Sequence, residues 1–333
     1  MERAGKNMTR RIIVFTLCAM LFALSVSADA QQTGKVFRIG FLDPSTASGT
    51  AGLLEAFRQE LSKLGWIEGK NITIEYRFAE QKQKRLPELA ADLVRLKVDL
   101  IVVTGQNAGL AAKNATATIP IVMVSGGDPV GLGLVASLAR PGGNVTGLSS
   151  LTAELITKRL EVLKDAVPKL TRVGLLWTPP GQDLQRKELR TAAQALKVKL
   201  EEIETQVDAK NLESAFQTAK QRQVGAIMTS AATSFFADRK RIVDLAGKYQ
   251  LPAIYPQREF VVDGGLMSYG VDLSDLYRRA AGYVDKILKG AKPADLPVQQ
   301  ATKFEFIINL KAAKQIGLTI PVEVLAKANQ VIK

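Results

Sequence analysis

Side chains that could bind or transform a small molecule lie in loops that follow short apolar segments. In the first half of the chain these loops contain Ser45, Thr46, Thr104, Gln106 and Asp128. Hydroxyls, amides and isolated carboxylates hold polar molecules by hydrogen bonds and ion pairs. An aromatic ring beside a carboxylate suits an amine or a ring-bearing ligand. The pattern predicts a ligand-binding site made of these residues and of their counterparts in the second half: Trp177, Ser230, Thr233, Tyr255, Tyr269 and Asp272.

Several of these residues also fit purely structural roles. The hydroxyls of Ser45, Thr46 and Ser48 precede a helix, where they could cap its first turn or where the helix N-terminus could favour an anion such as a carboxylate. Asp128 stands before Pro129 and fits a turn. Trp177 fits a packing role, and Asp272 fits an N-cap. Both interpretations stay open for each residue.

The residue types that are missing exclude several chemistries. The chain has no histidine and one cysteine, Cys18, which removes Ser-His-Asp and Cys-His catalysis and cysteine-ligated zinc or iron–sulfur sites. No G-x-x-x-x-G-K-[ST] motif occurs, and Gly126 to Gly133 does not spell a dinucleotide-binding fingerprint. We therefore expect no metal, no cofactor and no enzymatic activity. A secreted α/β enzyme that uses only Asp, Lys and Tyr is the alternative.

The net charge of +13 comes from 45 basic and 32 acidic residues. Such a charge could indicate a nucleic-acid partner. The basic residues are interspersed with acids, however, as in Lys158-Arg-Leu-Glu161, and no basic run of five or more and no aromatic-interleaved patch occurs. We expect no nucleic-acid binding.

Residues 1–30 have the pattern of a secretory signal peptide. Arg10 and Arg11 precede the apolar segment Ile12–Leu24, and Ala28-Asp29-Ala30 fits a cleavage site. The apolar segment is shorter than the ~20 residues of a membrane-spanning helix, so an uncleaved anchor is the weaker interpretation. Translation could start at Met1 or Met8.

Short apolar strands alternate with helical patterns, which indicates βαβ units and parallel sheets. A strand Val36–Leu42 leads to a helix in which apolar residues recur every three or four positions and which Gly65 ends. Further strands are expected at 72–79, 99–104 and 119–125, with a helix around Leu86–Leu96 between the first two. Ligands bind beyond the carboxyl ends of such strands, where the candidate loops lie.

The same order of elements restarts near Arg172. The segments Arg172–Thr178, Gly225–Ser230 and Leu251–Tyr255 resemble Arg38–Leu42, Asp99–Thr104 and Ile119–Met123 in turn. We predict two similar doubly wound lobes: residues 35–150 with about 272–300, and about 151–271 with 301–333. The tail, with a helix at Leu276–Leu288 and a strand at Phe304–Ile308, would cross back between them as a hinge. One large doubly wound sheet is the alternative.

Two long motifs are similar to a known family. They are Ile119-Pro-Ile-Val-Met-Val-Ser-Gly-Gly-Asp-Pro-Val-Gly131 and Leu134-Val-Ala-Ser-Leu-Ala-Arg-Pro-Gly-Gly-Asn-Val-Thr-Gly-Leu148. Phe57–Trp66 and Ile307–Leu318 support the likeness, which spans about residues 36–332. The chain resembles the ABC-transporter substrate-binding family that includes the tryptophan/tyrosine-binding proteins.

The resemblance implies a type I periplasmic-binding-protein-like fold with a ligand cleft between its lobes. It implies a periplasmic monomer that passes a small molecule to an ABC permease driven by a separate ATPase. Characterised relatives bind aromatic amino acids, and an amino acid needs a carboxylate site and an ammonium site. The turn Ser45–Ser48 and Asp272 are the candidates for these two sites. A ligand-sensing subunit of a membrane receptor is an alternative function, whereas the effector domain of a transcriptional regulator would need a helix-turn-helix in place of the leader.

Overall fold

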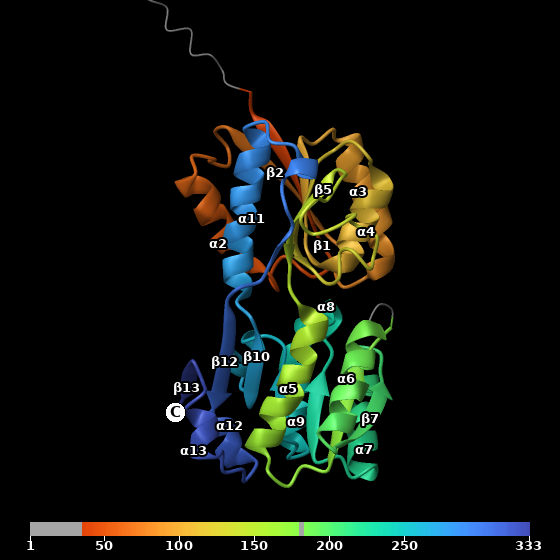
Figure 1. Ribbon diagram of the computed structural model, residues 1–333, viewed down its shortest axis with the longest axis vertical. Helices are drawn as coiled ribbons and strands as arrows, with labels where there is room; N and C mark the ends of the chain where they lie inside the picture. The colour runs from red at the N-terminus through yellow and green to blue at the C-terminus, as the bar shows by residue number, and fades with distance from the viewer. Residues whose placement is uncertain (1–34, 180–182) are drawn as a thin grey trace, which may run out of the picture. The chain divides into compact units, whose positions relative to one another are not determined.

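Two β-sheets, each flanked by helices, organise the part of the chain that the structure describes, residues 35–179 and 183–333 (Figure 1). The structure is a computed structural model, and Phe37–Lys333 form a single unit within it. The predicted signal peptide, with Cys18, lies outside the described residues.

The first sheet has six strands in the order β11-β5-β4-β3-β1-β2, and all of its pairings are parallel. We call this sheet and its helices lobe 1. Its strands are β1 (Phe37–Asp43), β2 (Ile72–Phe78), β3 (Leu100–Val103), β4 (Ile121–Gly126), β5 (Val145–Ser149) and β11 (Gln299–Gln300). Its helices are α2 (Ala51–Lys63), α3 (Leu86–Arg95), α4 (Gly105–Ala115) and α11 (Leu273–Leu288), with short 3-10 turns at Gln83–Arg85 and Pro293–Asp295.

Apolar residues at helical spacing bury one face of each helix of lobe 1. In α2 the buried residues are Leu53, Leu54, Phe57 and Leu61, and Gly65 ends the helix with a φ of +92°, a conformation that costs glycine little. Helices α2 and α11 cover one face of the sheet, and α3 and α4 cover the other (Figure 1). The predicted strands and helices of this half are therefore confirmed.

The second sheet has seven strands in the order β13-β12-β10-β9-β8-β6-β7. We call this sheet and its helices lobe 2. Its strands are β6 (Arg172–Trp177), β7 (Lys199–Glu204), β8 (Ala226–Thr229), β9 (Ala253–Tyr255), β10 (Met267–Val271), β12 (Phe304–Asn309) and β13 (Gln330–Ile332). Its helices are α5 (Thr152–Ala166), α6 (Asp183–Ala195), α7 (Ala209–Gln221), α8 (Thr233–Ala237), α9 (Arg239–Lys248), α10 (Glu259–Val262), α12 (Leu310–Gln315) and α13 (Val322–Leu325).

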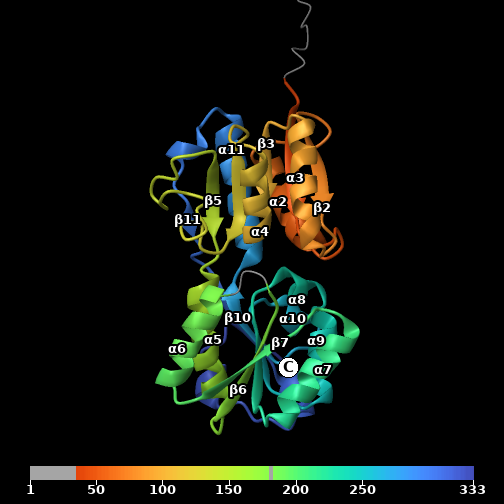
Figure 2. The ribbon, with the colours of Figure 1, turned by 90° about the vertical axis from the view of Figure 1, so that its right-hand side faces the viewer.

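The helices of lobe 2 also form two layers. Helices α5 and α6 pack on one face of the sheet, and α7 and α9 pack on the other (Figure 2). Each face has its own apolar core, centred on residues such as Leu160 and Leu175 on the first face and Phe216 and Ile227 on the second. Arg159 is an exception to this apolar composition, because its side chain is among the largest that are fully buried.

The strand order shows that the two lobes repeat one topology. Strands β2-β1-β3-β4-β5 and β7-β6-β8-β9-β10 follow the same doubly wound order, so the sequence echoes identified equivalent strands. The predicted pair of doubly wound sheets is confirmed. The second sheet departs from purely parallel pairing, because β12 runs antiparallel to β10. The chain passes between the sheets three times, from β5 to α5, from β10 to α11 and from β11 to β12.

Neither a helix able to span a bilayer nor a cluster of metal-ligating side chains occurs among the described residues. No helix in residues 35–179 and 183–333 has the length and apolar character needed to span a bilayer. Within the same residues, no group of three or more Cys, Asp or Glu side chains is arranged to hold a metal ion.

Candidate functional site

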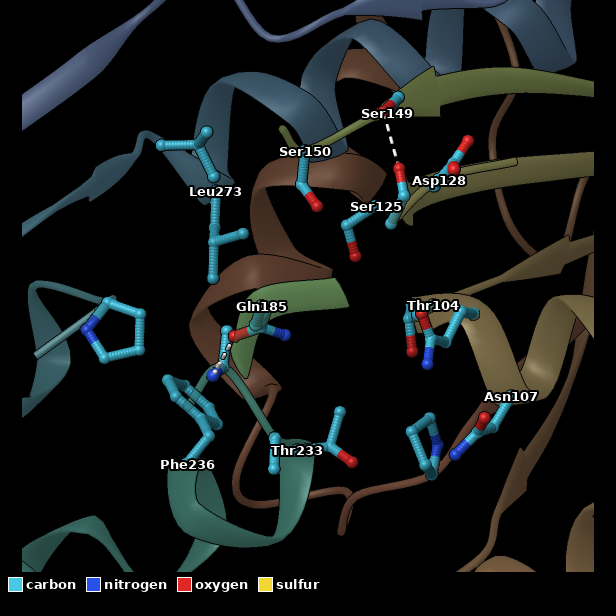
Figure 3. A pocket seen from close by; sticks show the side chains of 18 of the residues that line it. Thr104, Asn107, Ser125, Asp128, Ser149, Ser150, Gln185, Thr233, Phe236 and Leu273 are labelled. Atoms are coloured by element: carbon cyan, nitrogen blue, oxygen red, sulfur yellow. Dashed lines mark hydrogen bonds between the residues drawn. The ribbon is translucent and has the colours of Figure 1, made fainter. Parts of the chain in front are cut away.

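A cavity of about 650 Å³ lies at the carboxyl ends of the strands and is lined by residues of both lobes (Figure 3). The carboxyl ends of β1, β3, β4 and β5 contribute its lobe 1 wall, while α5, α6 and the loops after β6, β8 and β9 contribute its lobe 2 wall. Polar side chains on this lining are mainly hydroxyls and carboxamides: Ser45, Thr50, Gln83, Thr104, Gln106, Asn107, Ser125, Ser149, Ser150, Thr178, Gln185, Thr233, Ser234, Gln257 and Gln300.

Asp43, the last residue of β1, is the buried acid of the lobe 1 wall. The backbone N–H of Ser45 donates to its Oδ1 at 2.7 Å, and Oδ2 is buried beside the hydroxyls of Thr104 and Tyr277. Burial raises the pKa of Asp43, and the Ser45 amide together with the hydroxyls of Thr104 and Tyr277 offsets part of this rise. Asp43 therefore places a carboxyl in a confined, weakly solvated position.

Serine hydroxyls lie at the carboxyl ends of β4 and β5 in lobe 1. The Ser149 hydroxyl donates to the Gly127 carbonyl at 2.8 Å, and the Ser150 hydroxyl donates to the Gly126 carbonyl at 3.0 Å. Since each hydroxyl oxygen also has lone pairs, these serines can accept hydrogen bonds from a ligand while they hold the loop. In Figure 3 Ser125 lies close to both of them at the cavity wall.

Arg159 and Gln185 are the buried polar residues of the lobe 2 wall. Arg159 is 1% exposed, and its guanidinium donates to the backbone carbonyl of Tyr269 at 3.4 Å. Burial lowers the pKa of Arg159 to about 9. The Gln185 carboxamide accepts from the backbone N–H of Ala231 at 3.0 Å and extends toward the cavity (Figure 3).

One hydrogen bond joins the two lobes at the edge of the cavity. Gln83 Nε2 donates to Thr233 Oγ1 at 3.1 Å, and Asn107 Nδ2 donates to Gln83 Oε1 at 3.4 Å. The described residues thus place a carboxamide of lobe 1 against the first residue of α8 in lobe 2.

Five of the residues expected from the sequence line the cavity: Ser45, Thr104, Gln106, Asp128 and Thr233. Asp128 also has the turn role that its position before Pro129 allowed, because its Oδ1 accepts from the Gly131 N–H at 2.9 Å. Its side chain is exposed, so it lies at the rim.

Three expected residues, Thr46, Ser230 and Tyr255, lie outside the lining. The Thr46 hydroxyl accepts from the Gly49 N–H at 3.1 Å and stabilises the turn before α2. Ser230 is fully buried, and its neighbour Ala231 lines the cavity in its place. Tyr255 is fully buried and stacks on Phe260 at 4.5 Å, in the core on the α7–α9 side of the sheet.

Trp177, Tyr269 and Asp272 also lie outside the lining. The Arg186 guanidinium lies 3.7 Å from the centre of the Trp177 ring, and Tyr269 packs edge-on against Phe306. Asp272 caps α11, because its Oδ1 accepts from the Asp275 N–H at 2.9 Å. The structure therefore gives Asp272 the capping role that the sequence allowed.

Most polar residues of the lining were not among the candidates from the sequence, including Asp43, Arg159, Gln185 and Tyr277. Asp43 directly follows the predicted strand Val36–Leu42, so its position was a readable signal. Arg159, Gln185 and Tyr277 lie within helices, where their periodicity resembles that of any amphipathic helix. Only the packing of those helices over strand ends brings them to the cavity.

A polar cavity enclosed by two doubly wound lobes defines a two-lobed, periplasmic-binding-protein-like fold of the type that holds a solute between its lobes. The chain belongs to the ABC transporter substrate binding protein family, whose family model matches residues 43–332.

Comparisons with individual proteins agree with this assignment. A tyrosine-binding protein of Clostridioides difficile is 26% identical over 275 residues, which cover 83% of this chain and 78% of the relative. The structure of an ABC domain in complex with L-Trp from Streptococcus pneumonia has a TM-score of 0.80 and 27% identity, over 88% of this chain and all of that one. A conserved domain protein from Vibrio cholerae has a TM-score of 0.82 and 27% identity, over 89% of this chain and all of that one.

The family and the fold settle the general role. Members are extracytoplasmic substrate-binding proteins, generally without enzymatic activity, that work with ABC transporters. The resemblance seen in the sequence and the two-lobed α/β fold expected from it are both confirmed.

Proposed function

We propose that this protein captures a small polar organic solute, an amino acid, in the cavity between its lobes and delivers it unaltered to an ABC permease. The lining supports this function, because hydroxyls, carboxamides and two buried charged groups, Asp43 and Arg159, surround one cavity. Hydroxyls, carboxamides and charged groups hold a polar solute through hydrogen bonds and ion pairs.

The relatives favour an aromatic amino acid. One is named for tyrosine, and one was solved in complex with L-Trp. Two aromatic side chains, Phe236 and Tyr277, line the cavity beside aliphatic residues such as Leu53 and Leu273, which suits an apolar side chain on the ligand.

We infer that binding of the solute raises the fraction of molecules in which the two lobes are closed. Three chain crossings between the lobes can flex while each sheet stays rigid. A solute that contacts both walls binds the closed form more tightly than the open form and shifts the population toward it. A micromolar dissociation constant corresponds to a binding free energy of about −8 kcal/mol.

The place of action that we propose is the periplasm, reached through the signal peptide predicted at residues 1–30. A monomer suffices for this role, because both walls of the cavity come from one chain. The partners would be the solute, the permease and the separate ATPase that drives it.

A thermal-shift screen of the full mature chain tests the function. The panel contains the twenty amino acids, small peptides, organic acids and sugars, because a ligand that binds the folded state raises the melting temperature. Calorimetry then measures the affinity, and mass spectrometry of the solute after incubation measures conversion. Chemical conversion of a bound solute, or failure of every panel member to bind, contradicts the proposal.

A further inference from the structure

Hydroxyl groups of lobe 1 present oxygen acceptors, rather than protons, to the cavity. The Ser45 and Thr50 hydroxyls both donate to the Thr46 carbonyl, at 3.2 and 3.3 Å. The Ser149 hydroxyl donates to the Gly127 carbonyl at 2.8 Å. A hydroxyl has one proton and two lone pairs, so each of these oxygens has its proton engaged but can still accept from a ligand.

Asp43 is the acid at the centre of this wall. It is 2% exposed and lines the cavity at the carboxyl end of β1. The groups that donate to its carboxyl are neutral: the amide and hydroxyl of Ser45 and the hydroxyls of Thr104 and Tyr277. Burial still raises the pKa of Asp43, which is the direction expected of a carboxyl whose neighbours are neutral. Because Thr104 and Tyr277 direct their protons at the carboxyl, their oxygens also remain acceptors.

The backbone N–H groups of the turn after β1 are engaged as well. The Ser45 N–H donates to Asp43 Oδ1 at 2.7 Å, and the Gly49 N–H donates to Thr46 Oγ1 at 3.1 Å. An anion binds where N–H groups are free to point at it. Acceptor oxygens around a buried acid therefore favour a cation at this turn.

The charged residues that line the cavity are mostly acidic. In the part of the chain that the structure describes, the acids of the lining are Asp43, Asp128, Glu154 and Asp183, and the base is Arg159. The chain as a whole has a net charge of +13. The lining thus has the opposite sign to the chain, and a cleft lined mainly by one sign of charge concentrates solutes of the other sign.

Gln257 adds an acceptor on the opposite wall. It follows β9 in lobe 2 and lines the cavity, and its Oε1 is buried without a hydrogen-bond donor among the described residues. An alkylammonium group has three N–H donors and no acceptor. It can donate to several such oxygens at once, whereas a carboxylate can donate to none of them.

We propose that Asp43, together with the hydroxyl oxygens around it, binds an ammonium group of the solute, so that the cavity selects amine-bearing solutes over the corresponding acids that lack an amine. This inference rests on the proposed solute-binding function and names its substrate class. It places the amine at the turn Ser45–Ser48, which the sequence offered for the carboxylate, and replaces Asp272 by Asp43 as the ammonium site.

Ligand analogues test the inference on the unaltered protein. Calorimetry compares L-tryptophan and L-tyrosine with indolepropionic acid and hydroxyphenylpropionic acid, which lack only the amine, and with tryptamine and tyramine, which lack only the carboxylate. Because hydrogen bonds to a charged group are stronger than neutral ones, we expect loss of the amine to weaken binding about 10- to 100-fold. Equal binding of an amino acid and its deaminated acid, or no binding of any amine in the panel, overturns the inference.

The variant Asp43→Asn tests the residue. Asparagine keeps an acceptor for the Ser45 N–H and removes the charge, so we expect a folded protein that binds the tightest amine of the panel about 10- to 100-fold more weakly. Asp272→Asn is the matched control, because it removes the same charge from a carboxyl that also accepts a backbone N–H but lies outside the lining. It should bind as the wild type does. Wild-type affinity in folded Asp43→Asn overturns the inference.

A double-mutant cycle over residue and ligand separates recognition from structural support. In Asp43→Asn, removal of the amine from the ligand should change the affinity less than about threefold, because the charge that recognises the amine is gone. A purely structural role of Asp43 would instead weaken the amino acid and its deaminated acid by the same factor, and that result overturns the inference. If Asp43→Asn fails to fold, the analogues measured on the unaltered protein decide.

The panel also keeps this inference distinct from the proposed function. If the tightest ligand is an amine without a carboxylate and its binding depends on Asp43, the inference holds and the amino-acid assignment is wrong. If the tightest ligand is a neutral sugar whose affinity Asp43→Asn leaves unchanged, the solute-binding role stands and the inference is wrong.

Discussion

Gln83 of lobe 1 donates a hydrogen bond of 3.1 Å to the hydroxyl of Thr233 in lobe 2. The two residues are 150 positions apart in the sequence and both line the cavity. Nearby, the Thr233 methyl group lies 3.9 Å from the position that a Cβ on Gly105 would occupy. The two lobes therefore meet directly beside the ligand space, and a bond of this kind exists only when they are close.

The first prediction concerns this inter-lobe bond. We expect Thr233→Val, and likewise Gln83→Ala, to weaken ligand affinity about three- to tenfold, because a net hydrogen bond contributes about 0.5–1.5 kcal/mol to the closed form only. Calorimetry measures the loss, and small-angle scattering of the ligand-free variants measures the compactness. Lys84→Ala, exposed next to Gln83, is the control. Wild-type affinity in both variants would show that the bond does not bias closure.

The second prediction concerns the cap of α11. Asp272→Ala should lower the free energy of unfolding by about 1 kcal/mol, because the Asp275 N–H loses its acceptor. Asp272→Asn keeps an acceptor and should recover most of the loss. Ligand affinity should change less than twofold, since Asp272 lies outside the lining. Urea denaturation and calorimetry provide the two readouts, and a tenfold loss of affinity without a loss of stability would place Asp272 in the ligand site instead.

The third prediction concerns the pH dependence of stability through Asp43. Because burial raises its pKa above the usual value of 3.8, the folded protein binds this proton more tightly than the unfolded chain does. The contribution of Asp43 to stability is therefore fully present below pH 3.8 and declines as the pH rises through the raised pKa.

An amide at position 43 removes this titration. Asp43→Asn should be more stable relative to the wild type at pH 7 than at pH 3, because asparagine keeps an acceptor for the Ser45 N–H without a charge to desolvate. Denaturant unfolding across this pH range measures the difference. A stability difference between the two proteins that is constant with pH would contradict the assignment.

The fourth prediction concerns the Arg186 side chain. Arg186 lies over the Trp177 ring at 3.7 Å and pairs with Glu202 at 2.8 Å, so Arg186→Gln should lower the free energy of unfolding by about 1–2 kcal/mol. Arg190→Gln removes a more exposed partner of the same glutamate and should lower the free energy of unfolding by a smaller amount. Affinity should stay near that of the wild type in both variants. An affinity loss in Arg186→Gln alone would show that Trp177 contributes to the site through its stacking.

The sequence determined the fold of this protein almost completely. Alternating apolar strands and helices, together with the echo of Arg38–Leu42 in Arg172–Thr178, predicted two similar doubly wound lobes, and the loops after their strands predicted where a ligand would lie. These features are local. Hydrophobic periodicity, and the order of strands and helices along the chain, can be read from residues that are near one another in the sequence. For the same reason Ser45, Thr104 and Asp128 could be placed at the cavity before any tertiary contact was known.

Only the tertiary structure decided which polar groups face the solute. A strand-end residue can point into the cavity or into the sheet, and this is why Ser45 and Thr104 line the cavity while Ser230 and Tyr255 are buried in the lobes. A helical residue such as Arg159 carries no sequence signal of its own. It reaches the cavity because α5 packs across strands β8, β9 and β10, which follow α5 by at least 60 residues in the chain.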